Sequence, residues 1–567
     1  MIRTPGIKPP EGTVTVHLDD EPLTVRPGVS IAAALTGVGV VDYRHSAAGD
    51  RGLFCGMGVC GECALVVDGV PGRLACMTAV RDGMRLERQP RTPDVDLSLR
   101  PATDPEERVD VEVLVVGGGP AGLAAAATAA GSGAQVLLVD ERASLGGQYY
   151  KQPAAAFTVD PGRLDAQYRA GRTRVERVRA AGVRVLTGTQ IWGADGPREL
   201  YASGPDRRWI IRAQRVVLAT GAYERAVPFP GWTLPGVLTT GAGQSLLRSY
   251  QVAPGSRVLV SGNGPLNLQL AAELTRAGAT VVALVELGGI TEPKHAADVA
   301  RMAAASPGLV RDGARYLATL TRARVPMLSH ATVVRVEGAG RAERAVVARI
   351  ASDGRPVPGS ERSYDVDAVC VGLGFLPGNE IARIVGIDHT PDLAGAYVID
   401  RTPEGRTGVE NVWVVGDGAE VRGAKVAQNA GVLAGADVAA SLGHTPDAAV
   451  VRNARRLRAR HERFQAALWR TYAAPLLHSQ LAEADTVVCR CESVRLETID
   501  AALDGVQSSG AIKRLTRTGM GHCQGRFCGF VVDERVGRAG QGGPVGFAPQ
   551  PPFRPMPLAA LAAADEE

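Results

Sequence analysis

The segment VEVLVVGGGPAGLAAAATAAGSGAQVLLVDE, residues 111–141, decides the fold of most of this chain. An apolar strand enters the turn Gly117-x-Gly119-x-x-Gly122, an alanine-rich helix follows, and a second strand ends at Asp140. The first glycine permits the tight turn, the second lets backbone approach a pyrophosphate, and the third lets the helix pack closely on the strand. The helix N-terminus faces the phosphates, and Asp140 or the acid after it accepts hydrogen bonds from the ribose. The segment predicts a dinucleotide-binding fold.

Later segments favour FAD over NAD in this first fold. RASLGGQ (142–148), VVLATGAYERAVPFPG (216–231) and TGVENVWVVGDGAEV (407–421) resemble the segments around the cofactor in flavoproteins with two dinucleotide-binding domains. Asp417 is placed to hydrogen-bond the ribityl chain, and Gln428 lies on the helix expected to point at the flavin pyrimidine. The predicted FAD residues are Gly117, Gly119, Gly122, Asp140, Glu141, Gly147, Gln148, Thr220, Gly221, Gly416, Asp417 and Gln428.

A second strand–turn–helix–strand unit occupies residues 256–286. Gly262, Gly264 and Glu286 stand at the fingerprint positions, but Asn267 replaces the third glycine. The spacing predicts another nucleotide-binding fold, and NAD, a different adenine nucleotide and an empty site remain alternatives.

Clustered cysteines appear in LFCGMGVCGECALVV, residues 53–67, as Cys55-x4-Cys60-x2-Cys63, with Cys76 downstream. This spacing is typical of a plant-type [2Fe–2S] site, whereas zinc sites usually show two short pairs. The intervening glycines let the loop wrap a cluster and aim backbone N–H groups at its sulfurs. Zinc or disulfides are the weaker alternatives. The flanking sequence predicts a hairpin over Asp19–Asp20, a short helix and two more strands, which is the order of a β-grasp ferredoxin-like domain.

A second cysteine set lies near the C-terminus as Cys489-x-Cys491 and Cys523-x4-Cys528, with two predicted short helices between the pairs. The pattern resembles the bacterioferritin-associated-ferredoxin-like [2Fe–2S] domain, and zinc is a stronger alternative here than at the first set. His522 adjoins one cysteine, but four thiolates already complete a site.

Composition restricts the function classes. The 567 residues are 45% hydrophobic with a net charge of +4, and the aromatic fraction of 4% argues against a base-stacking nucleic-acid binder. No apolar run is long enough to span a membrane and the start has no signal-peptide core, and nine cysteines without an export signal favour the cytoplasm. An arginine-rich helix at 449–474 is read as a connector, with docking at the inner membrane face as the alternative.

The expected protein is multidomain, α/β and α+β, with two ferredoxin-like domains around a two-dinucleotide-binding-domain flavoprotein. The predicted divisions are 11–90 [2Fe–2S] ferredoxin-like, 91–108 linker, 109–250 and 365–448 FAD-binding, 251–364 NAD-like, 449–484 basic helical connector, 485–535 second [2Fe–2S] domain and 536–567 extended tail.

The motifs GLFCGMGVCGEC, GGGPAGL, GNGPLN, VVGDG, CRCE and GMGHCQGRFC together give a family resemblance over roughly residues 11–535. The chain is similar to the α, electron-transfer, subunit of heteromeric amino-acid and amine dehydrogenases: opine oxidases, D-hydroxyproline and dye-linked L-proline dehydrogenases, hydrogen cyanide synthase and the front part of heterotetrameric sarcosine oxidase. In several of these the ferredoxin is a separate small polypeptide, and here it is fused. The resemblance implies a partner flavoprotein, similar to D-amino-acid oxidase, that oxidises the C–N bond.

Three interpretations compete. The favoured one is an FAD- and [2Fe–2S]-dependent electron-transfer subunit within a hetero-oligomer. The alternative is a self-sufficient NAD(P)H-dependent reductase, and the weakest is a non-enzymatic iron–sulfur carrier or regulator, to which an FAD fold is superfluous. The sequence assigns no catalytic residue, substrate or terminal electron acceptor.

Overall fold

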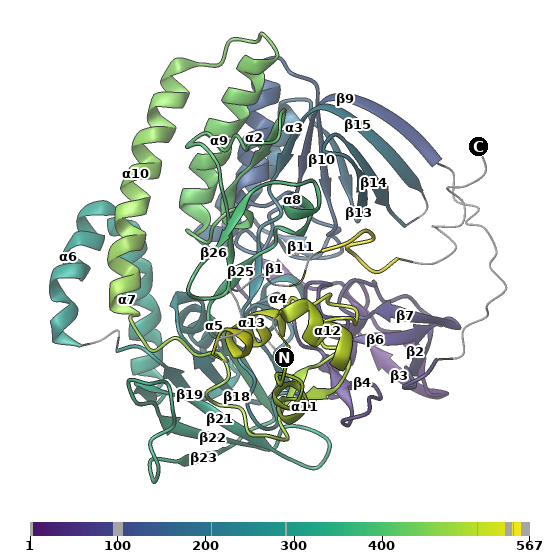
Figure 1. Ribbon diagram of the computed structural model, residues 1–567, viewed down its shortest axis with the longest axis vertical. Helices are drawn as coiled ribbons and strands as arrows, with labels where there is room; N and C mark the ends of the chain where they lie inside the picture. Colours follow the sequence, from purple (N-terminus) through teal and green to yellow (C-terminus); the bar gives the residue numbers. More distant parts are fainter. Residues whose placement is uncertain are drawn as a thin grey trace.

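The protein is described here by a computed structural model. It describes residues 4–93, 106–205, 207–289, 292–506, 508–538, 547 and 549–556. In Figure 1 the N-terminal strands lie at the lower right and the sheet built from residues 106–218 lies at the upper right. Helix α10 (Ala448–Thr471) runs along the left edge. No described helix is both long enough and apolar enough to cross a membrane.

The N-terminal domain is a five-stranded sheet with one helix. Its strand order is β3-β2-β8-β6-β7, with bounds β2 Val14–Leu18, β3 Glu21–Val25, β6 Ala64–Val67, β7 Val70–Leu74 and β8 Arg85–Arg88. Asp19 and Asp20 form the β2–β3 turn with φ values of 50° and 67°, a region that Asp tolerates. Helix α1 (Ile31–Gly37) begins after Ser30, whose side chain accepts from the Ala33 N–H. The predicted hairpin, helix and strands are confirmed.

The first nucleotide fold is a mixed sheet in the order β12-β10-β9-β15-β14-β13, with β28 paired to β15. The bounds are β9 Glu106–Val116, β10 Val136–Asp140, β12 Arg184–Thr187, β13 Gln190–Asp195, β14 Glu199–Ser203, β15 Arg208–Leu218 and β28 Val412–Val414. Helix α2 (Pro120–Gly131) follows the glycine turn directly. Helix α9 (Ala424–Ser441) packs on α2 through Gly431, where a Cβ would lie 2.1 Å from the Ala121 carbonyl oxygen.

The second nucleotide fold is larger than predicted. Its parallel sheet has the order β17-β24-β18-β19-β20, with bounds β17 Val237–Thr239, β18 Arg257–Gly262, β19 Thr280–Glu286, β20 Met327–Ser329 and β24 Ala368–Gly372. The predicted borders after residues 250 and 364 are therefore wrong, because β17, helix α4 (Thr240–Tyr250) and β24 belong to this fold. The glycine fingerprint marks only one strand of a sheet, and β17 and β24 lie outside the segment that it identifies.

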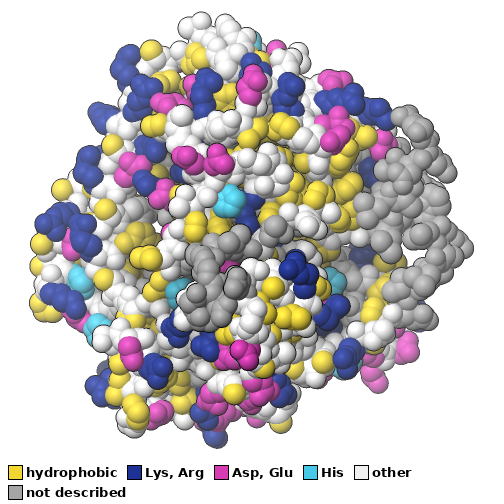
Figure 2. Space-filling model, in the orientation of Figure 1, with side chains coloured by type: hydrophobic (Ala, Val, Ile, Leu, Met, Phe, Trp, Pro, Cys, Tyr) yellow, Lys and Arg dark blue, Asp and Glu magenta, His cyan; other side chains and the backbone are white. Residues whose placement is uncertain are grey.

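The C-terminal part begins with α10, which packs on α9 and on α6 (Ala296–Ala305). Its arginines form ion pairs, such as Arg458 with Glu462 at 2.9 Å and Arg470 with Asp298 at 2.8 Å. Lys and Arg side chains are interspersed with Asp and Glu over the face shown in Figure 2. These contacts agree with a connector that has a solvated basic face.

Three short helices follow α10: α11 Leu496–Ala501, α12 Ser509–Thr516 and α13 Gly529–Arg538. Helix α13 continues past the predicted border at 535. In the tail, the Phe553 N–H donates to the Trp192 carbonyl at 3.0 Å and Phe553 is buried, so the described tail residues 549–556 lie on the first nucleotide fold. The structure does not describe residues 539–546, 548 and 557–567 of the predicted tail or residues 94–105 of the predicted linker.

Candidate functional site

The four cysteines of the first set are all buried. After burial, the neighbour that most affects the pKa of Cys55 is the Cys60 thiol, and the pKa of Cys76 depends most on the Cys63 thiol, so the four thiols divide into two neighbouring pairs. None of the four residues is more than 6% exposed. Two adjoining pairs fit a [2Fe–2S] cluster, because each of its irons takes two thiolates.

Backbone N–H groups point at these sulfurs. The Cys60 N–H donates to the Cys55 Sγ and the Glu62 N–H to the Cys60 Sγ, each at 3.4 Å. Burial would raise the pKa of Cys55, but the Cys60 thiol and the N–H groups of residues 57, 59 and 60 outweigh it and lower the pKa to about 6. These N–H groups thus favour the thiolate of Cys55, the form that binds iron, whereas burial and the neighbouring thiols raise the pKa of Cys60 and Cys76 well above the ordinary value.

The second cysteine set divides in the same way. The Cys528 thiol has the largest effect on the pKa of Cys489, and the Cys491 thiol has the largest effect on that of Cys523. The hydrogen bond from Cys491 lowers the pKa of Cys523 to about 7 against the opposing effect of burial. The Gly519 N–H also lies 3.5 Å from the Cys489 Sγ.

Within the described parts of the chain, no three His, Cys, Asp or Glu side chains converge on one metal-ion position. His522 packs over Gly61, where an added Cβ would lie 2.8 Å from the His522 Cβ.

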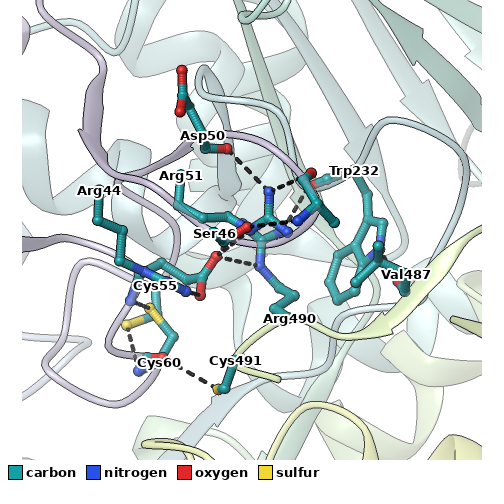
Figure 3. Close-up of polar contacts among 12 residues, drawn as sticks. Arg44, Ser46, Asp50, Arg51, Cys55, Cys60, Trp232, Val487, Arg490 and Cys491 are labelled. Carbon is teal, nitrogen blue, oxygen red and sulfur yellow. Dashed lines mark hydrogen bonds and ion pairs between the residues drawn. The ribbon is translucent and has the colours of Figure 1, made fainter. Parts of the chain in front are cut away.

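The two cysteine sets adjoin, although more than four hundred residues separate them in sequence (Figure 3). The Cys491 Sγ lies 3.8 Å from the carbonyl oxygen of Cys60. Phe54, next to the first set, packs against Phe527 of the second, with ring centroids 5.5 Å apart. The sequence predicted both sets but not their contact.

The predicted FAD segments meet at the carboxyl end of β9. A Cβ on Gly117 would lie 2.4 Å from the Ala219 carbonyl oxygen, and one on Gly147 would lie 2.7 Å from the Gly119 Cα. A Cβ on Gly119 would meet nothing nearer than the Gly147 Cα at 3.8 Å, so the helix N-terminus keeps an open face for a pyrophosphate. Thr220 and Gly221 face the 416–418 turn, where a Cβ on Gly418 would lie 2.7 Å from the Thr220 Oγ1.

The two predicted acids of the first fold have different partners. Asp140 accepts from the N–H groups of Gly118 at 2.6 Å and Arg142 at 2.8 Å, and burial raises its pKa to about 6. Glu141 instead pairs with Arg554 of the tail at 3.3 Å. The buried Nη1 of Arg142 has no partner among the described residues, which fits a site with room for an anionic group.

Asp417 lies in the loop before α9, and Gln428 lies in the first turns of that helix. The Asp417 Oδ1 accepts from the N–H groups of residues 422 and 423, each at 3.0 Å, and burial raises the pKa of Asp417. The Gln428 Oε1 accepts from the Tyr150 hydroxyl at 3.0 Å and the Arg174 Nε at 2.8 Å. The sequence did not predict these two partners.

Sequence reasoning also missed three buried polar residues between the FAD segments and the first cysteine loop. The Lys151 Nζ donates to the Gln148 carbonyl at 2.9 Å and to the Gln244 Oε1 at 3.1 Å. Burial lowers the pKa of Lys151 to about 7 and raises that of Glu224 to about 7. The Glu224 Oε1 and the Gln244 Nε2 have no partner in the described chain. No spacing rule marks these residues, because three separate segments supply them.

The same region connects to the ferredoxin-like domain. The Thr239 N–H donates to the Phe54 carbonyl at 2.9 Å, and a Cβ on Gly56 would lie 3.0 Å from Ala242 at the start of α4. The first cysteine loop is therefore in contact with the element that carries Gln244.

The second nucleotide fold has a covered turn. The Glu286 Oε2 accepts from the Gly264 N–H at 3.2 Å, and the Asn263 Nδ2 donates to the Tyr472 carbonyl at 2.9 Å. Trp469, at the end of α10, lies 3.9 Å from a Cβ built on Gly264. The end of α10 therefore lies against this turn.

Asn267, which replaces the third glycine, holds the fold together. Its Oδ1 accepts from the Thr240 hydroxyl at 2.7 Å, and its Nδ2 donates to the Gly372 carbonyl at 3.0 Å. Only 1% of the residue is exposed.

Comparisons with known proteins agree with this architecture. Residues 111–432 match the family described as pyridine nucleotide-disulphide oxidoreductase, and residues 11–91 match the 2Fe-2S iron-sulfur cluster binding domain. The chain is 32% identical to the HcnB subunit of hydrogen cyanide synthase from Pseudomonas aeruginosa, over 80% of this chain and 98% of that protein. It is also 32% identical to the A subunit of opine oxidase from Rhizobium meliloti, with the same coverage.

A solved structure of L-proline dehydrogenase from P. horikoshii shares the fold, with a TM-score of 0.69, 23% identity and 97% coverage of both chains. The predicted resemblance, the N-terminal [2Fe–2S] domain and the dinucleotide-binding oxidoreductase fold are confirmed. The second cluster and the second nucleotide stay predictions.

Proposed function

The chain belongs to the pyridine nucleotide-disulphide oxidoreductase family, in the group that includes the HcnB subunit of hydrogen cyanide synthase and the A subunit of opine oxidase, and from this we propose that it is the electron-transfer subunit of a heteromeric amino-acid or amine dehydrogenase. It is an FAD- and [2Fe–2S]-type oxidoreductase by its two matched domains. The proposed complex oxidises a C–N bond on a partner flavoprotein and passes the electrons through this chain.

The observation that carries the proposal is the contact between the two cysteine sets, 3.8 Å from the Cys491 Sγ to the Cys60 carbonyl oxygen. We assign [2Fe–2S] clusters to Cys55, Cys60, Cys63 and Cys76 and to Cys489, Cys491, Cys523 and Cys528. A flavin accepts electrons in pairs and releases them singly, whereas each cluster carries one. The chain's part is to hold these groups close together and away from water.

The proposed FAD site uses the residues predicted from the sequence. The glycines at 117, 119 and 122 shape the turn under the pyrophosphate, Asp140 holds that turn in place, and Asp417 is placed for the ribityl chain. Lys151, which donates to the Gln148 carbonyl, and the buried Glu224 are proposed to hold or accept protons near the flavin, since both have a pKa of about 7.

The competing function, an NAD(P)H-dependent reductase, is less well supported. Trp469 and the Tyr472 carbonyl lie against the second glycine turn. We propose that this fold acts as a spacer and does not receive NADH.

Purification of the chain alone and with its partner tests the proposal. We expect FAD and about four irons per chain, no bleaching of the flavin by NADH, and no dye reduction with proline, hydroxyproline, sarcosine or opines until the partner is added. Cys60→Ser and Cys523→Ser should each remove one reduced-cluster EPR signal and leave the other. Turnover of such an amine by the isolated chain would contradict the proposed role within a heteromeric complex.

A further inference from the structure

A buried carboxylate lies where the two cysteine loops meet. Glu62 stands between two cysteines of the first set and is 0% exposed. Its Oε1 lies 2.6 Å from the Arg44 Nη2, and its Oε2 lies 3.4 Å from the Arg51 Nε and 3.1 Å from the Arg490 Nη2. Arg44 and Arg51 come from the ferredoxin-like domain itself, whereas Arg490 comes from the C-terminal domain.

Arg490 has the equivalent place in the second set, directly between Cys489 and Cys491. Its guanidinium stacks between Phe54 at 3.9 Å and Trp232 at 4.7 Å, and its Nη1 donates to the Trp232 carbonyl at 2.6 Å. Only 3% of Arg490 is exposed. Figure 3 shows Arg490 close to Arg51 of the opposite domain. A fully buried, charge-assisted pair such as Arg490 with Glu62 fixes geometry strongly.

We infer that the Glu62–Arg490 ion pair positions the two cysteine loops as one electron-transfer junction, which electrons cross at the contact between Cys60 and Cys491. The inference rests on the proposed function, because it requires a cluster in each set. One electron lost by the group on one cysteine set is gained by the group on the other, with no bond made or broken and no proton moved. Both residues are therefore positioning residues for this transfer.

The surrounding charge has a separate consequence. Three arginines surround one carboxylate, so positive charge is in excess beside both cysteine sets. Each one-electron reduction adds a negative charge to a cluster, and nearby positive charge in a buried region stabilises the reduced form. Removing any one of these arginines should lower the reduction potentials, whereas of the three Arg490 is the one that reaches Glu62 from the other cysteine loop.

Arg490→Met and Arg44→Met form a matched pair for the full-length protein loaded with FAD and iron. Each removes one positive charge from the same carboxylate, and methionine keeps apolar volume between Phe54 and Trp232. The readouts are iron content, a redox titration of each cluster, and the EPR spin coupling between the two reduced clusters. We expect both variants to shift the potentials downward, Arg490→Met alone to lose the coupling, and Arg490→Lys to retain it.

Unchanged coupling in Arg490→Met, or an equal loss in Arg44→Met, overturns the inference. Loss of iron from the second set in Arg490→Met, with Arg44→Met fully loaded, also overturns it, because Arg490 would then serve cluster retention. A wild-type protein with a single cluster signal overturns the proposed function and this inference together. Two uncoupled wild-type signals overturn the inference alone.

Discussion

The two glycine-rich turns, at Gly117 and Gly262, begin the same strand–turn–helix unit, yet different segments cover them. Cβ atoms built on Gly119 and Gly264 have nearly equal room, with their nearest atoms at 3.8 Å and 3.9 Å. The difference lies beside the second turn, where the Tyr472 carbonyl accepts from the Asn263 side chain. A fingerprint therefore indicates the local fold, and segments from elsewhere in the chain decide whether a dinucleotide can enter.

The pKa of the acid that follows each turn is raised by burial, and it is raised more at the second turn. Burial raises the pKa of Asp140 to about 6 and that of Glu286 to about 8. Burial therefore favours the protonated form of Glu286 more strongly than that of Asp140. Glu286 is then a weaker acceptor for ribose hydroxyls than Asp140.

The largest effect is expected at the first turn. In Gly122→Ala the new Cβ would lie 1.8 Å from the Gly117 carbonyl oxygen. Because the backbone there cannot move aside, we expect the free energy of unfolding to fall by about 3 kcal/mol or more and bound FAD to be lost. Gly119→Ala is the control, since its Cβ has room; it should melt like wild type while retaining less FAD. Wild-type melting and flavin content in Gly122→Ala would show that the turn is not built as described.

The second turn should respond differently to restoring the fingerprint. Asn267→Gly recreates the third glycine but removes the hydrogen bonds to Thr240 and Gly372, so we expect destabilisation of about 2 to 4 kcal/mol. FAD content should be unchanged, and NADH should still fail to bleach the flavin. NADH-dependent bleaching gained by this variant would mean that Asn267, and not the end of α10, closes the site.

Much of this arrangement could be predicted from local sequence. The hairpin at Asp19–Asp20, both glycine turns and the two cysteine sets each depend on residues close together in the chain. Contacts between distant segments could not be predicted in this way. Arg490 on Glu62 and Tyr472 on Asn263 join residues far apart in sequence, and no periodicity or spacing encodes such pairs.

A smaller effect is expected at Asp417. Asp417→Ala removes the acceptor for two backbone N–H groups and the proposed bond to the ribityl chain, so FAD retention should weaken by about 1 to 3 kcal/mol. Flavin content after dilution and gel filtration measures it. Glu286→Ala is the matched variant in the second fold and should leave flavin content unchanged. Equal flavin loss in both variants would remove the distinction between the two folds.

The smallest effect concerns pH and the buried carboxyl of Glu286. Its pKa is about 8 in the folded protein against an ordinary 4.5, because burial disfavours the ionised form. Between these values the folded state binds more protons than the unfolded state, so the free energy of unfolding falls as pH rises and levels off above pH 8. From pH 6 to pH 8 this one group should lower the free energy of unfolding by about 2 kcal/mol.

Glu286→Gln is the control, because it keeps an acceptor for the Gly264 N–H without titrating. The difference between its stability curve and that of wild type therefore isolates Glu286 from Lys151 and Glu224. Asp140 should add its own decrease at lower pH, ending near pH 6. Parallel curves for wild type and Glu286→Gln in denaturant titrations would show that Glu286 is already ionised in the folded chain, and the contrast between the two acids would then be lost.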